Sequence, residues 1–315
     1  MKLFVIFLFL GVYALFAKEI APYRSIKVGD ATTDFVRADN KLIVSTRESS
    51  VMVHDLLSGK LLEKITIPTQ QNILGNTIGI IVTSVDTLDG KIIFATRHLD
   101  SWGDIYMYEQ KKLTKLLDAS KKIAPKEIKF ANANQIIIGT MENEIILFDM
   151  VRREVLYKKH LSEASFSDFV LSEDKKVLFS ADEAPTLYKI DIKSGEVIER
   201  YDEANKRDIF AIDYKNNTLA TGGKDKRLVL YRSAKSHKTA SADFFISSVA
   251  LSQDATRVAF SKNEAGDLTV VQTNNFQELA TLKGHTTKVV KMEFLDNSEL
   301  LTADDRGTLY FWKIK

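Results

Sequence analysis

A short sequence pattern recurs seven times along the 315 residues. It consists of an apolar run, a polar turn and a second run in which apolar and polar residues alternate. Before each copy lies another short apolar run, followed by a turn rich in Asn, Asp or Gly. One early apolar position per copy can be aligned: Leu42, Ile92, Ile136, Val177, Leu219, Val258 and Leu300. Their successive separations are 50, 44, 41, 42, 39 and 42 residues. Such a spacing restricts the chain to folds built from seven similar units.

Each unit has the pattern of four short strands, a to d, joined by turns. No long apolar pattern with the period of a helix competes with this assignment. A unit of about 40–45 residues with four strands is typical of one blade of a β-propeller. The sequence therefore predicts an all-β, seven-bladed β-propeller.

The last unit supplies only three strands before the chain ends: Val289–Phe294, Leu300–Thr302 and Leu309–Trp312. A spare strand, Pro22–Val28, stands in front of the first unit. Because a two-stranded edge is weak alone and a blade needs its fourth strand, we predict that Tyr23–Val28 lies against Leu309–Lys313. The N-terminal strand would then complete the last blade and close the ring.

Residues 1–17 have the pattern of a secretory signal peptide. Lys2 precedes an apolar run from Leu3 to Ala17, and the polar pair Lys18-Glu19 follows. We expect cleavage after Ala17, export to the periplasm, and a single propeller domain over residues 18–315. The alternative is an uncleaved membrane anchor, for which the run is short, because a membrane span takes about 20 apolar residues.

Composition excludes several kinds of site. The chain has no cysteine, which rules out disulfides, thiolate zinc sites, iron–sulfur clusters and covalently attached c-type haem. Its 44 Lys and Arg residues nearly balance 42 Asp and Glu, so charge gives no reason to expect a nucleic-acid partner. The motifs HExxH, GxSxG and GxGxxG are absent from the sequence. We therefore expect no catalytic residue, no metal and no cofactor.

The last unit resembles a WD40 repeat, because Gly284-His285 precedes a strand that ends at Trp312. The fifth unit is similar to the hairpin of that family, where Gly222–Lys226 runs into Leu228–Tyr231. The resemblance implies a WD40-like propeller with a hydrogen-bonded structural set in the last unit. Its members would be His285, Thr302, Asp305 and Trp312, with Asp304 as the alternative acid.

Two further patterns have a functional and a structural interpretation. Asp-x-x-Ser-Gly begins at Asp55 and at Asp191 and resembles a turn of quinoprotein propellers, which bind a redox quinone and use one tryptophan per blade. The chain has two tryptophans, so we prefer a plain turn in which Asp accepts from backbone amides and Gly takes a positive φ. Each loop between strands b and c also holds an acid, which suits either a cation ring or turn capping: Glu48, Asp100, Glu142, Asp182, Asp225, Glu264 and Asp304.

Two insertions depart from the repeat. One, Thr69–Gly79, lies between units one and two, and the other, Arg97–Asp104, lengthens the loop between strands b and c of unit two. In a propeller these two kinds of connection open on the same face, so the insertions should converge beside one blade. Rigid scaffolds carry function on loops, and Trp and Arg are enriched at binding hot spots. We predict a partner-binding surface made of Arg47, Asn72, Asn76, Arg97, His98, Asp100 and Trp102.

These features favour an exported, non-catalytic platform that binds a protein partner. The whole chain looks like the NapL-type accessory proteins of periplasmic nitrate reductases, because it is small, exported, cysteine-free and WD40-like. That resemblance implies a helper in maturation of, or electron delivery to, a periplasmic reductase or its electron-transfer subunits. The alternative is a propeller enzyme, either a metal-dependent hydrolase or lactonase or a quinoprotein, which would use the central channel.

Overall fold

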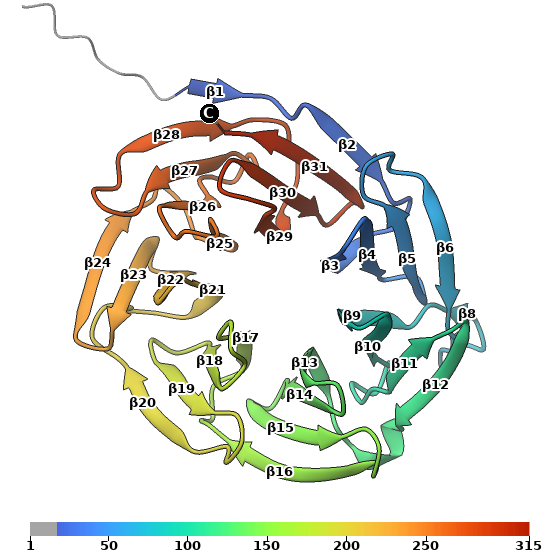
Figure 1. Ribbon diagram of the computed structural model, residues 1–315. Coiled ribbons are helices and arrows are strands. Elements are labelled where there is room, and N and C mark those ends of the chain that lie inside the picture. The colour runs from blue at the N-terminus through green and yellow to red at the C-terminus, as the bar shows by residue number, and fades with distance from the viewer. Residues whose placement is uncertain (1–17, 315) are drawn as a thin grey trace, which may run out of the picture.

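The computed structural model describes residues 18–314, so the expected leader, residues 1–17, lies outside the described part. Seven antiparallel sheets stand around a central axis like the blades of a propeller (Figure 1). The predicted all-β, seven-bladed fold is therefore confirmed. The one helical turn among these residues is η1 (Ala119–Lys121). No helix within residues 18–314 is long and apolar enough to cross a membrane.

The blades follow one another in chain order, each with its innermost strand first. Blade one holds β3 (Thr32–Ala38), β4 (Lys41–Thr46), β5 (Ser50–Asp55) and β6 (Leu61–Thr66). Blade two holds β9 (Ile81–Leu88), β10 (Lys91–Arg97), β11 (Ile105–Glu109) and β12 (Lys112–Leu117). Blade three holds β13 (Pro125–Asn132), β14 (Gln135–Thr140), β15 (Glu144–Asp149) and β16 (Glu154–His160).

Blades four to seven repeat this order. Blade four holds β17 (Phe166–Leu171), β18 (Val177–Asp182), β19 (Leu187–Asp191) and β20 (Val197–Tyr201). Blade five holds β21 (Ile209–Lys215), β22 (Thr218–Gly223), β23 (Arg227–Ser233) and β24 (Ser236–Ser241). Blade six holds β25 (Val249–Leu251), β26 (Arg257–Ser261), β27 (Leu268–Gln272) and β28 (Glu278–Leu282), and blade seven holds β29 (Val289–Phe294), β30 (Glu299–Asp304) and β31 (Thr308–Lys313).

The core lies between neighbouring blades. The second strand of a blade is covered by a blade on each side, so β4, β18 and β30 are buried over almost their whole length. Strands covered on both faces are apolar in continuous runs rather than in alternation. This burial explains why runs such as Leu42–Val44 and Ile136–Ile138 made the repeat visible in the sequence.

The N-terminal segment closes the ring, as the sequence predicted. Strand β2 (Arg24–Lys27) pairs antiparallel with β31 and becomes the fourth strand of blade seven, with Ile26 opposite Leu309. Strand β1 (Lys18–Ile20) was not predicted; it pairs parallel with β28 and adds a fifth strand to blade six. The first eleven described residues therefore form a strap across the outer edges of two blades (Figure 1).

Candidate functional site

The two insertions of the sequence meet on one face of the ring. We call this the upper face; it carries the loops between the second and third strands and the connections from one blade to the next. The first insertion folds into a small hairpin of β7 (Gln70–Gln71) and β8 (Thr77–Ile78). The backbone amide of Leu99, in the loop of blade two, donates to Oε1 of Gln70 over 3.2 Å. The predicted convergence is therefore confirmed.

The end of the same insertion touches the neighbouring loop of blade one. A Cβ atom placed on Gly79 would lie 3.2 Å from the backbone oxygen of Arg47 and 3.0 Å from the Glu48 carboxylate, which is a tight contact. Arg47 itself is exposed. The structure thus brings Arg47, the hairpin and the blade-two loop into one surface.

Asn72 shapes the hairpin from within. Its Oδ1 accepts hydrogen bonds from the backbone amides of Leu74 and Asn76, both over 3.0 Å. Such side-chain bonds to the backbone are the usual way in which Asn fixes a turn. The result is an apolar tip: Ile73 is 101% exposed and Leu74 is 78% exposed. The sequence interpretation missed these two residues.

The blade-two loop is closed upon itself. The amide of His98 donates to the carbonyl of Trp102 over 2.8 Å, and the amide of Trp102 donates to Oδ1 of Asp100 over 3.3 Å. Gly103 allows this path, because a Cβ there would lie only 1.7 Å from the carbonyl oxygen of Thr96. Trp102 is left half-buried and Leu99 is 58% exposed.

A buried carboxylate anchors the base of this loop. Asp104 accepts from the Tyr106 hydroxyl over 2.8 Å and from the Ala119 amide over 2.8 Å, and Lys115 Nζ lies 3.0 Å from it. Burial and the hydrogen bond to Asp104 raise the pKa of Tyr106 to about 12. His98 Nε2 lies 3.4 Å from the same carboxylate. Of the predicted residues, Asp100 helps to hold the loop in shape through its bond to the Trp102 amide, whereas His98 Nε2 makes no hydrogen bond with any residue that the structure describes.

Burial lowers the pKa of Lys126, a residue of β13 that lines the channel, and the charge of Arg97 adds to this effect. Lys126 and residues of blades four to seven also line a hollow of about 650 Å³. Phe244 and Phe245 stack there with ring centroids 4.7 Å apart. The upper face is therefore hollowed at its centre and built up at blades one and two.

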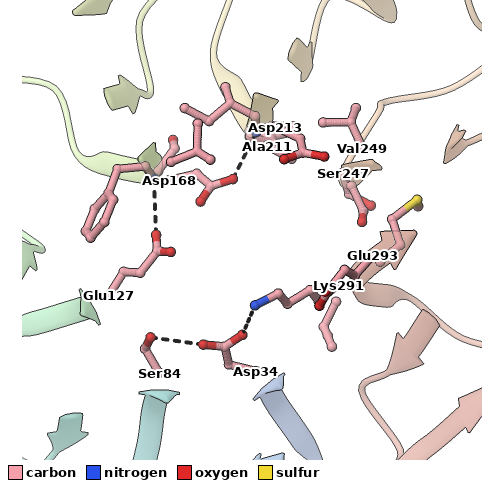
Figure 2. A pocket seen from close by; sticks show the side chains of 18 of the residues that line it. Asp34, Ser84, Glu127, Asp168, Ala211, Asp213, Ser247, Val249, Lys291 and Glu293 are labelled. Atoms are coloured by element: carbon pink, nitrogen blue, oxygen red, sulfur yellow. Dashed lines mark hydrogen bonds and ion pairs between the residues drawn. The ribbon is translucent and has the colours of Figure 1, made fainter. Parts of the chain in front are cut away.

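The channel itself is lined by the innermost strand of every blade and encloses about 430 Å³ (Figure 2). Five carboxylates of the innermost strands join one blade to the next, because each accepts a backbone amide of the following innermost strand. Asp34 accepts from Val85 over 3.0 Å, Asp86 from Phe130 over 2.7 Å, Glu127 from Phe169 over 3.1 Å, Asp168 from Ile212 over 2.9 Å, and Asp213 from Leu251 over 2.7 Å. An inner strand would otherwise present unpaired amides at a buried edge. The sequence interpretation did not identify this set.

The ionisable side chains of the channel also affect one another's charge. Burial alone would raise the pKa of Asp34, but Lys291 Nζ lies 2.6 Å from its carboxylate and lowers that pKa to about 2. Burial and the neighbouring Asp168 raise the pKa of Glu127. Within residues 18–314, no group of three or more His, Asp or Glu side chains is arranged to hold a metal ion.

The turn interpretation is confirmed for both Asp-x-x-Ser-Gly motifs and for some of the loop acids. Asp55 and Asp191 each accept from the backbone amide three residues later, and Gly59 and Gly195 both have a φ of 72°. In the loops between second and third strands, Asp225 and Asp304 likewise accept backbone amides within their own turns.

The structural set of blade seven forms with one correction. His285 Nε2 lies 2.6 Å from Thr302 Oγ1, and Trp312 Nε1 donates to the same hydroxyl over 2.9 Å. The acid is Asp304, whose Oδ2 lies 3.4 Å from His285 Nδ1. Asp305 was the wrong choice, because β30 continues through Asp304 and the turn begins only after it. Asp304 also accepts the amides of Arg306 and Thr308, which fixes the turn.

Comparison with known proteins agrees with this set. Residues 276–313 match the family model described as WD domain, G-beta repeat. The matched stretch runs from the end of blade six through the His285–Thr302–Trp312 cluster. The match and the seven blades together support a WD40 β-propeller. No curated protein matches the chain.

WD40 propellers generally mediate contacts between proteins, and two features of this propeller bear on such a role. It has a rigid ring, closed by the strap, and a surface on the upper face that the repeat itself does not require. We call this surface the blade-two loop surface; it consists of Arg47, Asn76, Arg97 and Trp102.

Proposed function

We propose that this protein is an exported, non-catalytic platform that binds a protein partner through its upper face at blades one and two. The observation that carries the proposal is the contact between Leu99 and Gln70, which joins two independent insertions into one surface. This surface is one that the seven-fold repeat itself does not require. The expected leader, residues 1–17, supports export.

The proposal is tested with the chain from Lys18 onward, tagged and used to capture partners from a periplasmic extract. Arg97→Ala with Trp102→Ala should lower the recovery of the specific partner at least tenfold, while the melting temperature stays within about 2 °C. Arg207→Ala is the matched control, because Arg207 is an exposed arginine in another connection of the upper face. Equal recovery with the double variant would contradict the assignment of this surface.

The finer proposal is that the partner is a periplasmic nitrate reductase or one of its electron-transfer subunits. Its support is the resemblance of the whole chain to NapL-type accessory proteins, that is, the leader, the size and the absence of cysteine. A cysteine-free chain would act by docking and would carry no covalent haem or cluster. Capture of purified reductase by the wild type but not by the double variant is the expected result.

The non-catalytic assignment is supported by the way the channel carboxylates are already used between blades. Elemental analysis and an absorption spectrum of the purified protein test it. A stoichiometric metal or a bound chromophore would replace the platform with the propeller enzyme as the preferred function.

A further inference from the structure

The rim of the ring beside blade two carries apolar side chains that no described part of the chain covers. The β7–β8 hairpin lies outside the ring of outer strands, next to the end of β12 (Figure 1). Its tip exposes Ile73 and Leu74 almost completely. Because Asn72 fixes the turn from within, the tip cannot fold back to hide them. Exposed apolar groups held in this way mark an interaction site.

Lysines follow directly along the same rim. The edge strand β12 and the turns before and after it carry five of them in twelve residues: Lys111, Lys112, Lys115, Lys121 and Lys122. Lys115 is occupied by ion pairs to Asp104 and Asp118. The other four are exposed and form no ion pair with any residue that the structure describes. Besides Asp118, this edge carries Glu109, which lies opposite Lys112 in the ladder.

Backbone contacts join the apolar tip to the lysines. The hairpin touches the blade-two loop through Gln70 and Leu99. That loop in turn holds the lysine turn, because Gly103 donates to the carbonyl of Ile123 over 3.0 Å and Asp104 accepts the amide of Ala119 over 2.8 Å. The hairpin tip and Leu99 therefore lie beside the turn of Lys121 and Lys122, and β12 leads from there along the outer edge of the ring to Lys111 and Lys112 at its other end. We call these residues together the blade-two rim.

We propose that the blade-two rim binds the surface of a membrane that contains anionic phospholipid. Apolar side chains at a protruding tip enter the boundary between head groups and acyl chains, and lysines beside them meet the phosphates. The spread of the lysines over a strand and a turn suits a flat anionic surface better than a single acidic groove. Contact at the rim leaves both open faces of the ring accessible, so it goes beyond the protein-binding role and does not compete with it (Figure 1).

The probe is a set of large vesicles, either phosphatidylglycerol and phosphatidylcholine in equal parts or phosphatidylcholine alone. Flotation uses the chain from Lys18, because all seven blades lie after that residue and the apolar leader would bind lipid by itself. We expect binding to the anionic vesicles only. Binding should weaken strongly between about 0.1 M and about 1 M salt, as the Debye length falls from about 10 to about 3 Å.

Three variants separate the parts of the proposal. Ile73→Ser with Leu74→Ser should reduce partition onto anionic vesicles at least tenfold. Replacing Lys111, Lys112, Lys121 and Lys122 by Gln should reduce it by about fivefold for each lysine. Val197→Ser with Ile198→Ser is the matched control, since these residues are 37% and 54% exposed on the outer strand of blade four; it should bind like the wild type.

Two results would overturn the proposal: no binding of the wild type to anionic vesicles, or undiminished binding of the tip variant. If the tip variant instead loses the captured protein partner and vesicles are not bound, the tip is a protein contact and the platform proposal stands. If Arg97→Ala with Trp102→Ala leaves partner capture intact while the tip variant loses vesicle binding, the platform surface is wrong and the membrane contact stands.

Discussion

Two regions of the molecule contain the same kinds of residue but treat them differently. At the seam, where the strap pairs with blades six and seven, apolar side chains are buried and polar groups are paired. At the blade-two rim they are exposed. At the seam, the strap buries Ile26 and Val28, and Tyr23 and Val28 donate backbone hydrogen bonds to blade seven. His285, Thr302 and Trp312 satisfy one another inside the adjoining blade. At the rim, Ile73 and Leu74 stay in water, and four lysines stay unpaired among residues 18–314.

The difference shows how one repeat can serve stability and binding at once. Where a blade keeps the WD40-like pattern, its polar side chains form hydrogen bonds within the fold. Where a blade carries insertions, the extra residues are held rigid but leave side chains free. Substitutions at the seam should therefore change the free energy of unfolding, and substitutions at the rim should change binding alone.

The largest effect is expected from deleting residues 18–28. The deletion exposes the edges of β28 and β31 and removes two buried side chains, each of which contributes about 1.5–3 kcal/mol. The free energy of unfolding should fall by about 5 kcal/mol or more, measured by urea denaturation. Deleting only residues 18–21 is the control and should cost far less, because β1 is mostly exposed. Equal stability of the longer deletion and the wild type would refute closure by the strap.

Next comes Thr302→Val, which removes the hydroxyl shared by His285 and Trp312 without changing the shape of the side chain. Two buried nitrogen atoms then lack a partner, at about 1–3 kcal/mol each. We expect a loss of about 2–5 kcal/mol in thermal or chemical unfolding. In blade two, Thr96→Val removes a hydroxyl that bonds the Asp104 backbone, and its smaller cost should be about 1–2 kcal/mol. A larger loss of stability for Thr96→Val than for Thr302→Val would contradict the contrast between the seam and blade two.

The third effect is a pH dependence at the channel side of the seam. Lys291 of blade seven lowers the pKa of Asp34 in blade one from 3.8 to about 2. Stability from this pair is present above about pH 4 and is lost as the pH falls toward 2, by about 2 kcal/mol in total. Lys291→Met leaves burial to raise the Asp34 pKa, so this carboxyl should no longer cost the variant stability as the pH falls from about 4 toward 2. Parallel stability curves for both proteins between pH 2 and 6 would argue against this ion pair.

The smallest effect on stability belongs to the rim. Ile73→Ser with Leu74→Ser should change the free energy of unfolding by no more than about 0.5 kcal/mol, because neither side chain packs against the ring. Urea denaturation measures it. A clear destabilisation would mean that the tip is part of the fold, and the seam and the rim would no longer differ in kind.

The architecture and the closing strand could be predicted because they depend on patterns within one unit. Seven apolar runs at near-constant spacing indicate blades, and Tyr23–Val28 was the one unassigned strand before unit one. The meeting of the two insertions followed from propeller topology. Their details did not, since Asn72 was taken for a binding residue when its carboxamide is used within the turn.

The channel carboxylates escaped prediction for a physical reason. Each one bonds an amide in the next blade, about one repeat away, and an amide has no sequence signature. The acids also occupy different places along their strands, with Asp34 before and Asp86 after the midpoint. The sequence also did not show whether Asp304 or Asp305 contacts His285, because this depends on the residue at which β30 ends.

The strap also determines when the ring can become stable. Strands β1 and β2 are the first to be synthesised, but their partners β28 and β31 are among the last. During synthesis, the N-terminal strands must wait unpaired, and the finished blades keep open edges that can join other chains. Completion of the ring is thus a single late event in which the oldest and newest parts of the chain meet.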